Sequence, residues 1–410
     1  MKAVYKYFSP LIAAFFFLLL WQDKGHAQGK CLIVSDIHYN PDSTYKLQPG
    51  NDSNHELLEQ SIKAMQHTLP NPDFIMIAGD FIWHGDRNNG YKISKETKTA
   101  IIKTITDVFQ KHFPHVPVIA TLGNNDTYQE DYDIQDGDFL NMFADQWEKG
   151  GVKVFNAPFR EKGYYAYTIK DKYPDMEFVV LNTTLLSVVN NNKGYNAKAD
   201  SMLKWLNNTL LDAKNKGQKI WIVSHIPPGK NVYSMLNKSA TTDMWGSNYS
   251  QTYTNLIVKY APQIRFSIAS HTHFNDFRVF CDAGGKPVSY MRVVPSISPN
   301  HYNNPSFEVA DFDKDYRVTN ETTYYLDLKT LSTTGFVFKP AFGIGTSGLS
   351  AVSPAGILSF INGHSTPQSP VPTGYIQFYN VGAQPVENDT NCYSKTFYEY
   401  LSTSVLRKVK

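Results

Sequence analysis

Cysteine is scarce in this sequence, with only three among 410 residues and no pair spaced as C-x-x-C. Thiolate-ligated zinc sites need closely spaced cysteines, so their absence argues against that class of metal site. The odd number leaves at least one cysteine outside any intramolecular pair. Cys31 opens an apolar, strand-like segment and is predicted to be buried, whereas Cys281 and Cys392 form a candidate disulfide that the sequence alone does not decide.

Neither sign of charge predominates, since 39 Lys and Arg against 37 Asp and Glu leave a formal net charge of +2. Proteins that bind nucleic acid electrostatically carry a basic stripe, and the nearest candidate here, at 406–410, is predicted to be a solvated tail. Hydrophobic residues make up 42% and charged residues 19%, which favours a sizeable core over disorder. We therefore expect a globular protein that does not bind nucleic acid.

Long apolar runs are missing after the first residues of the chain. At its start, Lys2 and Lys6 precede an apolar run from Leu11 to Leu20, and small residues follow up to Ala27. This layout is typical of a secretory signal peptide, and a run shorter than the roughly 20 residues of a bilayer span argues against an uncleaved anchor. We predict cleavage after Ala27, a mature protein with no stable membrane anchor, and a secreted or periplasmic location.

One pattern recurs along the chain: a short apolar segment ends in polar residues of metal-ligand type. Such segments are predicted to be buried strands, and apolar residues at helical spacing lie between them at 56–69, 94–113 and 199–216. This alternation indicates an α/β fold, in which ligands gather beyond the carboxyl ends of the strands. The strands and their polar residues are 32–34 with Asp36 and His38, 74–78 with Asp80, 116–120 with Asn124, 220–223 with His225, and 264–269 with His271 and His273.

The composition changes after about Asp327, because 343–372 is rich in Gly, Ser and Pro. A further strand is predicted at 375–381 and a terminal helix at 394–406. We interpret this part as a small accessory region packed on the core, with a flexible linker as the alternative. The predicted organisation is a signal peptide at 1–27, a main domain at 28–330 and a C-terminal accessory region at 331–410.

The polar residues at the strand ends are of the types that bind divalent cations. Carboxylate, imidazole and amide oxygen ligands suit hard or borderline ions, and a carboxylate can bridge two of them through its two oxygens. Asp80 and Asn124 each follow a glycine, which allows the backbone to approach a metal closely. Each cluster alone is common in proteins, but several in order, each at a strand end, indicate a two-metal site.

These clusters resemble the five motif blocks of the calcineurin-like metallophosphoesterases: Asp36-Ile37-His38, Gly79-Asp80, Gly123-Asn124-Asn125-Asp126, Ser224-His225 and His271-Thr272-His273. The resemblance implies two mixed β-sheets packed face to face and flanked by helices, with 28–330 as the catalytic domain. It implies one ion held by Asp36, His38, Asp80 and His273, and a second held by Asp80, Asn124, His225 and His271. Zinc is the metal expected for this ligand set, with manganese or iron as alternatives.

The acid sphingomyelinase-like branch of that family is more similar still. Its second block resembles Gly79-Asp80-Phe81-Ile82-Trp83-His84, and the likeness extends through 295–299, 304–307 and 324–328. This branch implies hydrolysis of phosphodiesters or related phosphoryl compounds by metal-activated water, with choline lipids or soluble nucleotides as substrates. Aromatic residues, 14% of the chain, are core material far more often than lipid contacts, so we expect a small soluble phosphoester.

The third block departs from that of most relatives, which have a histidine after the asparagine. Asn125 takes its place, and an amide can hydrogen-bond a phosphoryl oxygen but cannot usefully donate a proton. His84 is therefore predicted to protonate the leaving group, and Asp126 to orient Asn125. The histidines outside the motifs, His301 among them, are interpreted as surface or packing residues.

Two alternatives follow from Asn125. Endopolyphosphatase-like relatives resemble this chain in reading Gly-Asn-Asn-Asp, which makes polyphosphate or a phosphomonoester the alternative substrate. Polyphosphate would require several basic side chains near the site, for which the candidates are Arg87, Lys92, Lys230 and Arg278. The alternative from another class is a non-catalytic, metal-containing binding protein. The oligomeric state is left open by the sequence.

Overall fold

A computed structural model describes residues 28–86, 90, 92–231, 242–343, 352–366, 368–369, 371–383 and 397–409. The predicted signal peptide and Cys392 lie outside these ranges. Within them, Cys31 is buried as predicted, and both Cys31 and Cys281 are unpaired. The helices of this part of the chain include none that is long and apolar enough to cross a membrane.

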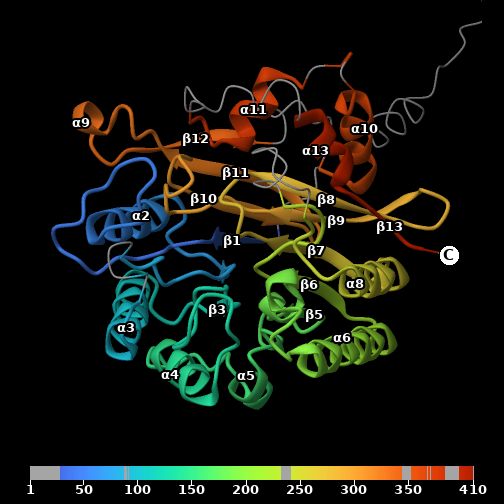
Figure 1. Cartoon of the computed structure of the whole chain (residues 1–410), viewed down its shortest axis with the longest axis horizontal. Helices are drawn as coiled ribbons and strands as arrows, with labels where there is room; N and C mark the ends of the chain where they lie inside the picture. The colour runs from blue at the N-terminus through green and yellow to red at the C-terminus, as the bar shows by residue number, and fades with distance from the viewer. Residues whose placement is uncertain are drawn as a thin grey trace, which may run out of the picture.

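The first sheet has six strands in the order β12-β11-β10-β1-β2-β3 (Figure 1). Strands β1, β2 and β3 run parallel, and β10, β11 and β12 continue the sheet in antiparallel fashion from β1. Parallel neighbours bring their carboxyl ends to one edge of the sheet. The strands are β1 (Gly29–Val34), β2 (Phe74–Ile77), β3 (Val118–Ala120), β10 (Ser306–Phe312), β11 (Val318–Leu326) and β12 (Phe338–Gly343).

The second sheet has seven strands in the order β13-β8-β9-β7-β6-β5-β4. Its central strands β5, β6, β7 and β9 are parallel to their neighbours within that group, so β6 and β7 also end side by side. The strands are β4 (Tyr165–Tyr167), β5 (Met176–Val180), β6 (Lys219–Val223), β7 (Ile264–Ala269), β8 (Asp276–Cys281), β9 (Pro287–Val293) and β13 (Val405–Arg407).

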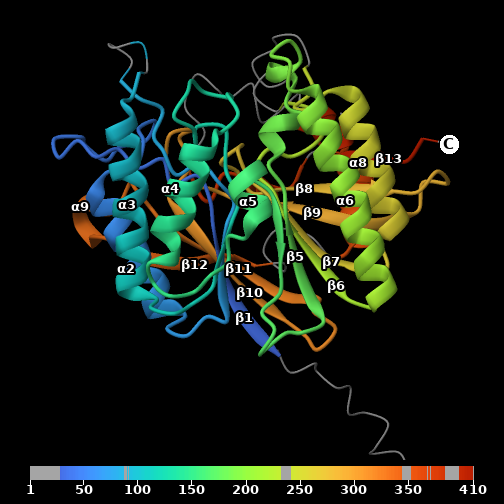
Figure 2. The ribbon, with the colours of Figure 1, turned by 90° about the horizontal axis from the view of Figure 1, so that it is seen from below.

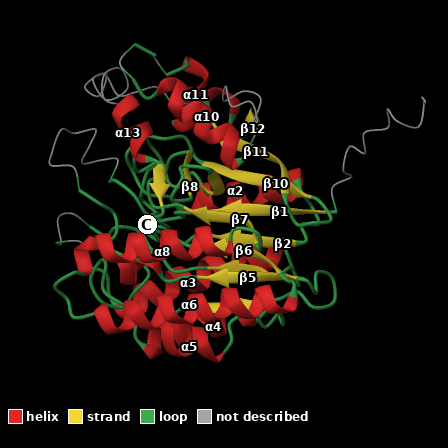
Figure 3. Ribbon diagram, turned by 90° about the vertical axis from the view of Figure 1, so that its right-hand side faces the viewer, coloured by secondary structure: helices red, strands yellow, loops and turns green. Residues whose placement is uncertain are grey.

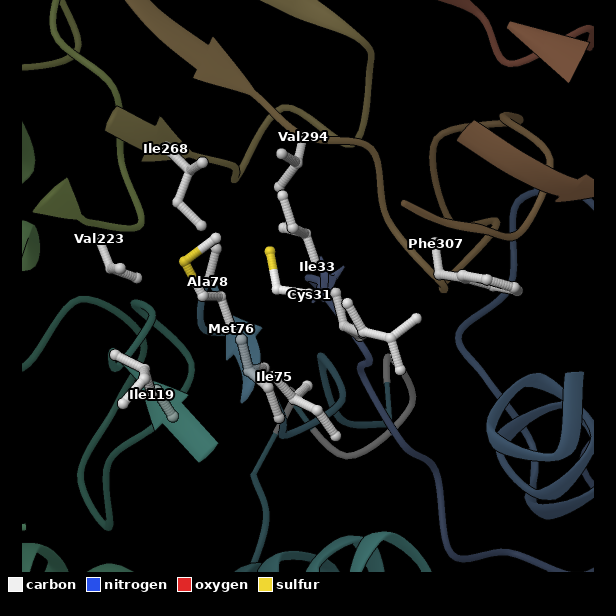
Figure 4. Close-up of a cluster of buried hydrophobic side chains, with 14 of the residues drawn as sticks. Cys31, Ile33, Ile75, Met76, Ala78, Ile119, Val223, Ile268, Val294 and Phe307 are labelled. Atoms are coloured by element: carbon white, nitrogen blue, oxygen red, sulfur yellow. The ribbon is translucent and has the colours of Figure 1, made fainter. Parts of the chain in front are cut away.

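The core lies between the two sheets. Figure 4 shows Cys31 and Met76 of the first sheet with Val223 and Ile268 of the second in one cluster of buried side chains. The motif strands are buried along almost their whole length, as expected of parallel strands covered on both faces. The predicted α/β fold with two mixed sheets packed face to face is confirmed.

Helices flank the sheets on both outer sides, with α2, α3 and α4 beside the first sheet and α6 and α8 beside the second (Figure 2). The three helices predicted from apolar spacing are present. Helix α3 begins after Ser94, whose side chain accepts a hydrogen bond from the Thr97 amide, and α6 ends at Gly217 in the left-handed conformation. The described helices between β1 and β7 are α2 (His55–Thr68), α3 (Lys95–His112), α4 (Gly137–Glu148), α5 (Ala157–Lys162), α6 (Asn196–Lys216) and α8 (Ser247–Tyr260). Two 3-10 turns, η2 (Thr183–Leu186) and η3 (Val188–Asn190), lie between α5 and α6.

The C-terminal part differs from its prediction in two respects. The segment predicted as a strand at 375–381 is mainly helix α11 (Thr373–Tyr379), because Tyr375, Phe378 and Tyr379 bury one helical face. The predicted terminal helix stops at the end of α13 (Phe397–Thr403). Of the segment predicted to be a solvated tail, Leu406 and Arg407 pair with β8 in strand β13, whereas Val409 is exposed. The short helix α9 (Leu331–Thr334) precedes β12.

The C-terminal helices are grouped together over one end of the sheets (Figure 3). Helix α10 (Pro354–His364) packs against β8, β9 and α13. Helix α10 is therefore part of the packed structure, and the interpretation of 331–410 as an accessory region stays a prediction. The boundary near residue 330 stays a prediction, and β12 and β13 from beyond it extend both sheets.

Candidate metal centre

The predicted metal ligands lie together where the parallel strands of both sheets end. Asp36, Asp80 and Asn124 follow β1, β2 and β3, which are neighbours in the first sheet. His38 also follows β1, whereas His225, His271 and His273 follow β6 and β7 of the second sheet and meet the others from that side. His225 Nε2 lies 3.1 Å from Asn124 Oδ1, and the His271 amide donates to Asp36 Oδ2 at 3.3 Å.

The backbone of these loops adopts an unfavourable conformation at the ligands themselves. A positive φ costs a residue other than glycine about 1–2 kcal/mol, because Cβ crowds the following carbonyl. Such residues tend to cluster at functional sites, where the surrounding structure enforces the conformation. The ligands with positive φ are Asp36 (44°), His38 (43°), Asp80 (56°), His271 (71°) and His273 (64°).

A first cation position is formed by Asp36, His38 and His273, whose ligand-type atoms lie within 4.8 Å of one another. His38 Nδ1 lies 2.9 Å from the Ile82 carbonyl oxygen, so it carries the ring proton and leaves the Nε2 lone pair free. His38 Nε2 is 3.5 Å from Asp80 Oδ2, and His273 Nε2 is 3.6 Å from Asp36 Oδ1. Asp36 Oδ1 and His38 Nε2 are buried with no hydrogen-bond partner among the described residues. Buried acceptors of this kind fit a bound cation.

A second position is formed by Asp80, His225 and His271. His225 Nε2 lies 3.2 Å from Asp80 Oδ2, while its Nδ1 is 2.7 Å from the Ala78 carbonyl oxygen. Asn124 donates from Nδ2 to Asp131 Oδ1 at 2.7 Å, and its Oδ1 is left to face His225. This division between an inward lone pair and an outward hydrogen bond is how proteins orient metal ligands.

The titration behaviour of these groups also fits bound cations. Burial and the nearby Asp80 carboxylate raise the pKa of Asp36 to about 7. Burial and the neighbouring cationic rings lower the pKa of His38 to about 4 and that of His271 to about 3. The neutral rings of His38 and His271 are in the form that binds metals, and a cation would favour the ionised form of Asp36. Burial alone would lower the pKa of His225, but the Asp80 carboxylate overcomes this effect and raises it to about 9, so a cation there would replace the ring proton. The donor set therefore fits two divalent ions.

Two glycines permit the loops to approach each other. A Cβ atom at Gly123 would lie 2.0 Å from Asp80 Oδ1, so any residue other than glycine would clash there. Gly79 has φ +91°, and a Cβ there would lie 2.7 Å from the Gly123 nitrogen. The two glycines that precede Asp80 and Asn124 therefore allow the loops of these two residues to lie close together.

The third-block residues contact Asp80 and its loop. Asn125 donates from its backbone amide and from Nδ2 to the two Asp80 carboxylate oxygens, at 2.9 and 3.0 Å. The carboxylate of Asp126 accepts from the amides of Asp80, Phe81 and Gly123, each at 2.8 Å. Asp126 therefore secures the backbone of both loops, in place of the predicted orientation of the Asn125 side chain.

His84 lies beside the first cation position. Its ring stacks on that of His38 with centroids 4.2 Å apart, and its Nδ1 lies 2.9 Å from Asp52 Oδ1. The backbone amide of His84 donates to Asp52 Oδ2 at 3.0 Å, and Asn300 Nδ2 donates to Asp52 Oδ1 at 2.9 Å. Burial alone would lower the pKa of His84, but the Asp52 carboxylate overcomes this effect and raises it to about 9.

A cleft of about 1020 Å³ opens beside these residues. Its wall includes His84, Asn125 and His301, so it reaches the predicted catalytic groups. Aromatic and charged side chains make up much of the remainder: Tyr45, Trp83, Tyr128, Asp52, Asp86, Glu130, Asp131, Lys92 and Lys98.

The sequence motifs did not identify several residues of the site. Asp52, Asp131 and Tyr132 belong to no motif, yet Tyr132 Oη lies 3.3 Å from His271 Nε2. His301, interpreted above as an ordinary surface or packing residue, lines the cleft, and its ring centroid is 4.5 Å from that of His273. Asn300 and His301 directly follow the 295–299 segment that resembles the branch, a signal that could have identified them.

Comparisons with known proteins agree with the motifs. A family model described as calcineurin-like phosphoesterase matches residues 29–275. The acid sphingomyelinase-like phosphodiesterase 3b of Homo sapiens is 25% identical over 357 residues, which span 79% of this chain and 77% of that protein. The cyclic GMP-AMP phosphodiesterase SMPDL3A of Homo sapiens is 25% identical over 334 residues, spanning 74% of this chain and 71% of that protein.

Among solved structures, a dimetal phosphatase from Danio rerio aligns with a TM-score of 0.49 and 13% identity, over 73% of this chain and 96% of that chain. The family model and the sequence relatives confirm the predicted family, its acid sphingomyelinase-like branch and the class of phosphoric ester hydrolase.

Proposed function

The chain belongs to the calcineurin-like phosphoesterase family, and we propose that it is an exported two-metal phosphodiesterase that hydrolyses a small, soluble substrate. The observation that carries this proposal is the juxtaposition of two ligand clusters with the cleft. Buried acceptors without partners, Asp36 Oδ1 and His38 Nε2, lie next to His84, which lines the cleft.

Asp36, His38, Asp80 and His273 would hold one ion, and Asp80, Asn124, His225 and His271 the other. Zinc is the metal we expect for this set of imidazole, carboxylate and amide ligands, with manganese or iron as alternatives. When bound, such ions lower the pKa of water and neutralise charge that develops on phosphoryl oxygens.

His84 is placed to act as the general acid. Its Nδ1 faces Asp52 at 2.9 Å, so the proton on Nε2 remains available to a leaving-group oxygen in the cleft. Asp52 has a side chain only 4% exposed and also binds the His84 amide, which fixes both the ring and its backbone. We assign Asp52 as the residue that positions His84.

Asn125 and Asp126 act on Asp80 in this proposal. Asn125 donates two hydrogen bonds to the carboxylate that is shared by the two cation positions. This arrangement directs its amide to Asp80 in place of a phosphoryl oxygen. Asp126 holds the backbone amides on either side, so the pair maintains the shared carboxylate while proton donation falls to His84.

The charges around the cleft favour a diester over polyphosphate. The carboxylates of Asp86, Glu130 and Asp131 line it together with only two described lysines, Lys92 and Lys98. Two other basic candidates have partners of their own, since Lys230 pairs with Asp243 and Arg278 is buried with Asp276 and Tyr400. Arg87 lies outside the described residues. A polyanion would be repelled by such a surface, whereas a diester carries a single negative charge. Two relatives named as phosphodiesterases support the same choice.

The test is hydrolysis by the metal-loaded protein beside Asp80→Ala. The substrates are bis-p-nitrophenyl phosphate, p-nitrophenyl phosphate, ATP, sphingomyelin and polyphosphate, each with zinc, manganese or iron. We expect metal-dependent turnover of the diester that Asp80→Ala abolishes. Preferred cleavage of polyphosphate would support the alternative substrate, and two bound ions without any turnover would support the binding protein. N-terminal sequencing of exported protein tests cleavage after Ala27.

A further inference from the structure

The turn that carries His271 and His273 requires support from outside itself. Both histidines have positive φ, 71° and 64°, so the isolated turn would relax to a more favourable backbone. On its N-terminal side the turn continues β7. On its C-terminal side it runs directly through Phe274 and Asn275 into β8, and these two residues are where the C-terminal region makes contact.

Asn275 is fully buried and hydrogen-bonded on every side. Its backbone amide donates to the Tyr379 carbonyl oxygen at 3.0 Å, and its Nδ2 donates to the Phe378 carbonyl oxygen at 2.8 Å. Its Oδ1 accepts from Nη2 of Arg292, a guanidinium that is itself held by Glu308 and Glu321. Asn275 thus links the ligand turn to the last turn of α11 and to the core.

The neighbouring ring contacts reinforce this link. Phe274 stacks on Tyr379 with centroids 4.9 Å apart and an interplanar angle of 21°. Phe277 stacks on Phe378 at 5.7 Å and 9°. Two residues of α11 therefore pack and bond against the segment that directly follows His273, and α11 lies with α10 and α13 over β8 (Figure 1).

We infer that Asn275 is a positioning residue for the metal ligand His273, and that α11 of the C-terminal region holds it in place. This inference rests on the proposed function, because it assigns His273 to a bound ion. It makes the C-terminal region a determinant of metal affinity, although that region lies beyond the residues matched by the family model.

The test compares Asn275→Ala with a matched control, Asn304→Ala, in the full chain. Asn304 is also buried, and its Nδ2 donates at 3.0 Å to the carbonyl oxygen of Val381, two residues after α11. Both variants lose one bond to the same segment, but only Asn275 adjoins the ligand turn. Zinc is titrated against a chromophoric chelator, and thermal unfolding of the metal-free proteins measures the loss of stability.

We expect Asn275→Ala to weaken the binding of one of the two ions by about 10- to 100-fold, as is usual when a residue that orients a ligand is lost. Asn304→Ala should lower the melting temperature by a similar amount while leaving both affinities close to those of the unmodified protein. If Asn275→Ala does not fold, Asn275→Ser replaces it, since serine retains a polar group but is too short to reach Phe378.

Unchanged zinc affinity in the Asn275 variant would overturn the inference and leave the proposed function intact. An equal loss of affinity in Asn304→Ala would also overturn it, because the effect would then follow general destabilisation. An unmodified protein that takes up no ion would refute the proposed function, and the inference with it.

Discussion

Two buried polar clusters of this protein contain similar residue types but differ in how their charges are balanced. In the cluster between β9, β10 and β11, Arg292 pairs with Glu308 and Glu321. In the metal centre, Asp36 and Asp80 are equally buried, yet the only described groups of opposite charge within reach are histidines.

The difference identifies which cluster is structural and which is functional. A guanidinium is permanently charged, so both carboxylates of the first cluster have an opposite charge within the fold, although Glu308 Oε2 and Glu321 Oε1 accept no hydrogen bond from the described residues. Burial keeps His38 and His271 neutral, so these rings do not compensate a carboxylate, whereas the Asp80 carboxylate outweighs burial and raises the pKa of His225 to about 9. The second cluster therefore has fewer fixed opposite charges of its own, which fits the two bound ions that we propose.

The largest expected effect is a loss of turnover on substitution of His84, which lies beside the metal ligands and pairs with the Asp52 carboxylate. His84→Gln should lower kcat by about 10²- to 10⁴-fold, the usual contribution of a general acid. Two ions should still bind, because His84 is not among the proposed ligands. Steady-state kinetics with metal analysis measures both. A variant that loses an ion along with turnover would instead place His84 among the ligands.

Arg292→Met breaks the cluster between β9, β10 and β11. Removal of the guanidinium leaves two buried carboxylates without an opposite charge, a change that typically costs about 3–5 kcal/mol of unfolding free energy. Urea denaturation of the metal-free protein measures the loss. Asp36→Asn is the matched variant in the metal centre, and it should not destabilise the metal-free protein, since it removes a buried charge that lacks a full partner. Similar losses in the two variants would remove the distinction between the clusters.

Metal removal tests the same comparison without mutation. Zinc at a hundredfold excess over its Kd should add about 2.7 kcal/mol of stability for each independent site, and a chelator should remove it. Differential scanning calorimetry with and without chelator measures the change. Asp80→Ala is the control, and its melting temperature should not respond to the chelator.

The smallest effect is expected at Tyr132, whose hydroxyl lies 3.3 Å from His271 Nε2. Tyr132→Phe removes this partner and should lower the affinity for one of the two ions by about tenfold, with little change in unfolding temperature. Tyr128→Phe is the control, because the Tyr128 hydroxyl contacts Thr99 at 2.7 Å, away from the ligands. Equal zinc affinity in the two variants would show that Tyr132 does not orient His271.

Much of the fold follows from local patterns. The motif strands, three of the helices and the burial of Cys31 were all predictable, because periodicity of apolar residues directly reflects which face of an element is buried. The segment at 375–381 was mispredicted for the same reason: its aromatic residues favour a strand when considered alone, and only packing against Asn275 and Phe277 favours a helix.

The sequence by itself determined the family to which this protein belongs and the types of ligand at its candidate metal centre. The types of ligand, their order and their places after apolar segments were sufficient to identify a phosphoesterase family, and they predict a two-metal ligand set. Those features are local, because each ligand is specified by the few residues that surround it.

Only the tertiary structure decided how that chemistry is supported. Asp52 approaches His84 with Asn300, Asn275 meets the end of α11, and Asn125 turns to Asp80. The positive φ of the ligands likewise depends on both sheets being in place. These partners are far apart in the chain, and hydrogen bonds between distant segments form only where the packing of the core brings the segments together.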